Sequence, residues 1–122
     1  MATIRSYTTI EQSRKLAEIL PLESADMFHF IHEVDTVGFG YKKDAQEFYS
    51  KTKFEYIPCW SLAALLEILD YLQLSKDKLG SGKEGWMVSV YPDNCRYDSC
   101  WHDNPVDACY EMILKLHEQS LL

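Results

Sequence analysis

The chain has 122 residues, of which 47% are hydrophobic and 25% are charged, and its formal net charge is -7. This length and composition predict a single domain over residues 1–122 with an apolar core, and they argue against a disordered chain. The acidic balance argues against nucleic-acid binding, which depends on Lys and Arg, and no apolar run approaches the roughly 20 residues that cross a bilayer.

The first residues lack the basic-then-apolar layout of a secretory signal peptide. We therefore expect a cytoplasmic location and no membrane association. In that compartment the cysteines are expected to be reduced thiols. There are four of them: Cys59, Cys95, Cys100 and Cys109.

The first predicted element is a helix that begins near Thr8 or Thr9. Thr8 with Glu11, or Thr9 with Gln12, has the spacing of a capping box, in which two residues satisfy each other's backbone donors. Pro21 should end this helix, because the residue before a proline is pushed out of helical geometry.

The chain between this helix and the middle of the sequence gives weaker patterns. Aromatic and branched residues predict an extended segment, two glycines predict a hairpin turn or loop, and a short alternation predicts another strand. In chain order we predict an extended segment at 27–34, a turn or loop at 35–41, one or two helical turns at 44–50 and a strand at 53–57.

A second helix is predicted from the leucines that follow Trp60. They recur at the spacing of an amphipathic helix, with Ser61 as a plausible N-cap. The repeating positions are Leu62, Leu65, Leu66, Leu69 and Leu72. The polar, glycine-containing residues 75–85 are interpreted as a loop.

The last third of the chain predicts a strand, a turn, a second strand and a helix. Residues 86–91 and 95–101 alternate, and a Pro-Asp-Asn turn separates them. Asn104 should cap the final helix and Pro105 suits its first position. The predicted buried face of this helix contains Val106, Cys109, Met112, Ile113 and Leu116.

These elements predict an α+β fold. Strands adjacent in sequence and joined by tight turns should pair antiparallel. We expect an antiparallel sheet of three to five strands packed against two or three helices, as a layered α/β sandwich.

Two short motifs contain residue types that bind phosphate or metal ions in other proteins. Gly80-Ser81-Gly82-Lys83-Glu84 lacks the residues and the following helix of a phosphate-binding loop, and we interpret it as a connecting loop. Cys95, Cys100 and His102 supply ligand types that zinc prefers, and Cys100 and His102 share a face of a strand. We prefer a packing role, with zinc binding as the alternative, and expect no cofactor.

Other histidines and cysteines allow only weak hypotheses. His29 and His32 would point to opposite faces of a strand, and we interpret both as half-exposed. Only a helical segment would bring them together. Cys59 precedes a helix start, which can activate a thiol, and it or Cys100 would be the nucleophile of a Cys-dependent enzyme with a histidine base. We prefer packing for Cys59.

The aromatic residues of the second half exceed what a core of this size needs. Tyr91, Tyr97 and Trp101 are the candidates for a partly exposed surface. Tyr and Trp are enriched at protein interfaces because they contribute a large area with few rotatable bonds. These three residues predict contact with a second copy or with another protein.

Part of the sequence resembles known proteins. Residues 57–66 (IPCWSLAALL), the strand beginning at Trp86 and residues 104–110 (NPVDACY) are similar to small proteins of unknown role from gut Bacteroides genomes, many in prophages or other mobile elements. The layout also resembles the phage ABA-sandwich domain, in which a Trp-bearing helix, a short hairpin and a final helix recur. The resemblance spans about residues 57–120, implies a layered α/β fold and carries over no catalytic or binding residue.

Together these patterns predict a non-enzymatic protein that acts through protein–protein contacts, as a homodimer or with an unidentified partner, and the resemblance implies a phage or mobile-element setting. The alternative is a small zinc-binding protein or a Cys-dependent enzyme that uses Cys95, Cys100 and His102.

Overall fold

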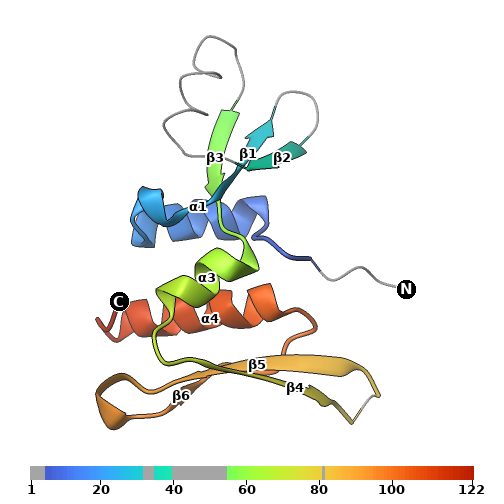
Figure 1. Ribbon diagram of the computed structural model, residues 1–122, viewed down its shortest axis with the longest axis vertical. Coiled ribbons are helices and arrows are strands. Elements are labelled where there is room, and N and C mark those ends of the chain that lie inside the picture. The colour runs from blue at the N-terminus through green and yellow to red at the C-terminus, as the bar shows by residue number, and fades with distance from the viewer. Residues whose placement is uncertain (1–4, 32–34, 40–54, 81) are drawn as a thin grey trace. The chain divides into compact units, whose positions relative to one another are not determined.

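The computed structural model describes residues 5–31, 35–39, 55–80 and 82–122 (Figure 1). These residues form an α+β protein with two three-stranded antiparallel sheets and three α-helices, so the predicted class is confirmed. The sequence predicted one sheet, whereas the described strands are divided between two. The chain forms two compact units, one of residues 7–64 and the other of residues 65–122 with the start of the chain, and each is described by itself.

The unit of residues 7–64 begins with helix α1 (Ile10–Ile19), capped by Thr9. The Thr9 hydroxyl accepts from the Gln12 amide at 3.1 Å, and the Gln12 side chain accepts from the Thr9 amide at 3.1 Å. This capping box was one of the two that the sequence offered. The helix ends at Ile19 with Leu20 as its C-cap, before Pro21 as predicted, and a 3₁₀ turn, η1 (Leu22–Ser24), follows.

The sheet of this unit has the order β2-β1-β3, with β1 (Met27–Ile31) paired antiparallel to both neighbours. The other strands are β2 (Asp35–Phe39) and β3 (Glu55–Cys59). Because β3 is an edge strand, it tolerates Pro58, which cannot donate to a ladder. Helix α1 packs on β3.

The prediction of a turn or loop at 35–41 was wrong for residues 35–39, which form β2. Gly38 lies opposite Phe28 in the register, and a Cβ at Gly38 would lie 2.6 Å from Cζ of the Phe28 ring. The glycine that suggested a turn therefore makes room for a ring inside a strand. The helical turns predicted at 44–50 lie outside the described residues.

Helix α3 (Leu62–Ile68) begins as predicted, because the Ser61 hydroxyl accepts from the Ala64 amide at 3.2 Å. It ends earlier than the leucine repeat predicted. Leu69 is buried, but Tyr71 has a φ of 52°, which no α-helix accommodates, so Leu72 does not continue the helix.

The unit of residues 65–122 contains a sheet of order β4-β5-β6, made of β4 (Gln73–Lys78), β5 (Glu84–Val90) and β6 (Tyr97–Asp98). The prediction of a loop at 75–85 was wrong for most of the segment. Its polar residues form an edge strand, held in part by Lys76, which pairs with Glu84 at 3.1 Å and lies 5.0 Å from the Trp86 ring centroid.

The predicted turn at 92–94 is a 3₁₀ turn, η2 (Pro92–Asn94), and the strand that follows it is shorter than predicted. After β6 the chain stays beside β5: the Ser99 amide donates to the Val88 carbonyl at 2.9 Å, and His102 forms a bridge with Trp86. Helix α4 (Pro105–Glu118) then packs on β5, as Figure 1 shows.

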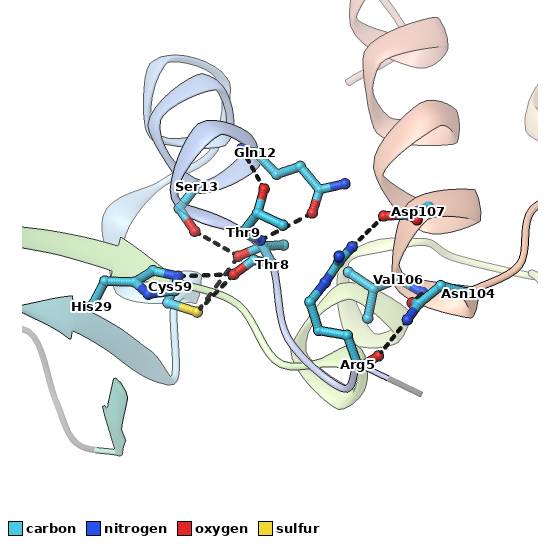
Figure 2. A network of polar contacts seen from close by, with 10 residues as sticks. All are labelled: Arg5, Thr8, Thr9, Gln12, Ser13, His29, Cys59, Asn104, Val106 and Asp107. Carbon is cyan, nitrogen blue, oxygen red and sulfur yellow. Dashed lines mark hydrogen bonds and ion pairs between the residues drawn. The ribbon is translucent and has the colours of Figure 1, made fainter. Parts of the chain in front are cut away.

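Helix α4 begins as the sequence predicted. The Asn104 side chain accepts from the Val106 amide at 2.8 Å and also donates to the Arg5 carbonyl at 2.9 Å, while Arg5 pairs with Asp107 in the first turn (Figure 2). The residues predicted to face the core, Val106, Cys109, Met112, Ile113 and Leu116, are all buried.

Candidate functional site

Cys100 and His102, two of the predicted zinc or catalytic residues, meet at one residue of α4. The Glu111 carboxylate accepts a hydrogen bond from the Cys100 amide at 2.8 Å and lies 3.1 Å from Nε2 of His102. The Lys115 ammonium lies 3.4 Å from the same carboxylate and also donates to the Asp98 carbonyl. The cluster thus ties the segment after β6 to α4.

The charge of Glu111 is favoured by these contacts. Partial burial acts to raise the pKa of its carboxyl, but hydrogen bonds from the Cys100 amide, from His102 and from the Cys100 side chain, together with the Lys115 charge, hold that pKa below its usual value. Activation of a cysteine requires a base or a cation at the sulfur. Here the His102 imidazole pairs with the Glu111 carboxylate, and the same carboxylate accepts from the Cys100 amide.

Cys95 is an exposed residue directly after η2, and its amide donates to the Pro92 carbonyl rather than to the Glu111 cluster. Within the described ranges, no group of three or more His, Cys, Asp or Glu side chains is arranged to hold a metal ion. The residues proposed for zinc therefore do not combine into a ligand set among the described residues.

Cys59 and His29 belong to a buried polar cluster around Thr8 (Figure 2). Nε2 of His29 donates to the Thr8 carbonyl at 2.8 Å, and the Cys59 thiol donates to the same oxygen at 3.5 Å. The interpretation of His29 as half-exposed was wrong, since its side chain is only 1% exposed. His32 lies outside the described residues.

An open cavity of about 300 Å³ lies within the unit of residues 65–122. Three segments line it: residues 68–71 where α3 ends, residues 90–93 between β5 and η2, and Leu116 with Leu121 and Leu122 at the end of α4. The backbone turns sharply in two of these segments, because Tyr71 and Asp93 both have a φ of 52°.

Exposed apolar side chains gather around this cavity. Among the described residues, five large hydrophobic side chains are exposed, and four of them line it. They are Tyr71 (89% exposed), Tyr91 (41%), Leu121 (37%) and Leu122 (43%). Contiguous exposed apolar surface of this kind marks interaction sites.

The three aromatic residues proposed from the sequence take different positions. Tyr91 lines the cavity, and its hydroxyl approaches Gln73 at 3.5 Å. Trp101 is 40% exposed but does not line the cavity, and Tyr97 is half-buried in β6 opposite Val90. Sequence reasoning missed Tyr71, Leu121 and Leu122. Tyr71 was placed inside a helix predicted to reach Leu72, so nothing singled it out as an exposed residue.

Comparison with known proteins gave no match to any family model, curated protein or solved structure. None of the described helices is both long and apolar enough to span a membrane.

The four thiols should fall into two reactivity groups. Cys59 and Cys109 are fully buried, and burial raises the pKa of Cys109 to about 12, whereas Cys95 and Cys100 are exposed. Because the thiolate is the reactive form, we expect dithiobis(nitrobenzoate) to label two thiols quickly near neutral pH and the other two only after unfolding.

Cys95 is the internal control for this labelling. Rates for Cys95 and Cys100, measured in single Cys-to-Ser variants, should agree within about one order of magnitude. Labelling of Cys100 or Cys59 a thousand times faster than Cys95 would instead support a Cys-dependent enzyme.

Proposed function

We propose that this chain is a non-catalytic binding module that acts through protein–protein contacts in the cytoplasm. The observation that carries the proposal is the gathering of Tyr71, Tyr91, Leu121 and Leu122 around one cavity. We call these four residues the apolar rim. Leaving such residues in water is unfavourable by about 25 cal/mol per Å² of apolar surface, which a bound partner would recover.

The chemistry of the cysteine and histidine residues supports the same proposal. Cys100 and His102 are both held by Glu111, and Cys59 and His29 are both held by the buried backbone oxygen of Thr8. These contacts support a structural role for each pair. The resemblance of residues 57–120 to proteins of Bacteroides mobile elements supports an origin in a phage or another mobile element.

The carboxylates beside the apolar rim favour a different protein, rather than a second copy of this chain, as the partner. In a symmetric dimer the same surface patch is used by both copies, so carboxylates near the apolar rim would approach their own equivalents. Among the described residues, the cavity lining includes Asp70 and Asp93 and no cationic side chain. Like charges across an interface disfavour association.

The test uses the wild-type chain and a Tyr71→Ser, Leu121→Ser double variant as baits in cells that express the chain. Proteins that each bait captures are quantified by mass spectrometry. Trp101→Ser is the control, because Trp101 is also a large exposed apolar residue but lies outside the cavity lining. We expect a protein enriched by wild type and by the control and lost from the double variant. Equal recovery by all three would refute the proposal.

A further inference from the structure

We propose that the cavity binds a segment of a partner protein, which inserts one large apolar side chain and places a lysine or arginine beside it. This inference rests on the proposed function. The segment would lie between the end of α3 and the end of α4. This assigns a chemistry to the partner, which the exposed apolar rim alone does not define.

The lining of the cavity indicates an apolar occupant, and its size admits at least one large side chain. A volume of about 300 Å³ lies at the lower limit of pockets that take whole small molecules, roughly 300–1,000 Å³. Its apolar contacts come from Ile68, Leu69, Val90 and Leu116 together with the apolar rim. An aromatic or leucine side chain from a peptide can use such a lining without a larger ligand.

The charges around the cavity indicate a cationic neighbour. Asp70 and Asp93 are exposed, and among the described residues neither has an ion-pair partner. Two free carboxylates beside an apolar cavity are complementary to a Lys or Arg next to an apolar side chain.

The test uses three acetylated and amidated pentapeptides with terminal alanines: one with a phenylalanine between two lysines, one with a phenylalanine between two glutamates, and one with an alanine between two lysines. Binding is measured by ¹H–¹⁵N NMR titration of the full chain. We expect the Lys-Phe-Lys peptide to bind at least about tenfold more tightly than either of the others, with shifts in the segments that line the cavity.

The second arm removes the charges without disturbing the apolar lining. Asp70→Asn with Asp93→Asn should weaken binding of the Lys-Phe-Lys peptide by about threefold to tenfold and abolish most of its dependence on salt. The matched control, Asp77→Asn with Asp103→Asn, changes the net charge equally at exposed positions outside the lining and should leave binding unchanged. The NMR spectra of both variants also report that each is folded.

Two outcomes would overturn this inference. The glutamate peptide could bind as tightly as the lysine peptide, or the lysine peptide could fail to shift the cavity residues at millimolar concentration. If the capture experiment still shows a protein that depends on Tyr71 and Leu121, the proposed function stands and only the assigned chemistry fails. If both experiments fail, the proposed function fails as well.

Discussion

Replacement of Trp60 by alanine should cause the largest loss of stability of any single change considered for this chain, about 3–5 kcal/mol. Trp60 is fully buried, so the substitution leaves a cavity as well as removing apolar contacts. It also removes the hydrogen bond of 2.9 Å from the indole Nε1 to the Ser24 hydroxyl. A domain of this size is typically stable by only about 5–15 kcal/mol, so much of that margin would be lost.

The measurement is urea unfolding followed by circular dichroism, together with amide exchange in β1 and β3. Trp60→Phe separates the two causes, because it keeps most of the ring and removes the indole donor. Trp101→Ala is the control at a tryptophan that is 40% exposed, and it should cost much less than Trp60→Ala. Equal losses at the two tryptophans would contradict the burial described for Trp60.

Replacement of Thr8 by valine should cost about 1–3 kcal/mol although it barely changes the shape of the side chain. The Thr8 hydroxyl lies 2.7 Å from the Ser13 hydroxyl and donates to the Cys59 sulfur at 3.6 Å (Figure 2). It also accepts from the Trp60 amide at 3.2 Å. Valine would leave the Trp60 amide buried without its side-chain partner.

Thr8→Ser is the matched control for the valine variant. It keeps the hydroxyl and removes a methyl group, which is worth about 0.8 kcal/mol when fully buried. Urea unfolding should therefore rank wild type first, serine second and valine last. A valine variant as stable as wild type would show that the hydroxyl network adds nothing to the stability of this unit.

The parts of the fold that the sequence predicted correctly depend on local interactions. Thr9 and Gln12 lie three residues apart and satisfy each other, and Asn104 caps a helix whose first residue is Pro105. In each case both partners lie within one turn of chain. Such contacts can be inferred from spacing alone.

The strands that were missed depend on partners beyond a single turn of chain, on the neighbouring strand. Residues 73–78 have little strand propensity of their own and become a strand by pairing with β5. In residues 35–39, which pair with β1, the glycine at position 38 obscured a strand pattern. The apolar rim was missed for a similar reason. Tyr91 was identified from its residue type, but its neighbours Tyr71 and Leu121 come from separate segments that only the fold brings together.

The two borders of the sheet in the unit of residues 65–122 affect how readily the chain aggregates at high concentration. Its outer strand β4 ends in Lys76, Asp77 and Lys78, all exposed, and its opposite border is the two-residue β6. Alternating charge on one border and brevity on the other both oppose the addition of strands from other molecules, which leads to fibrils. Neutral residues at positions 76–78 would remove this protection and leave a long ladder open to polymerisation.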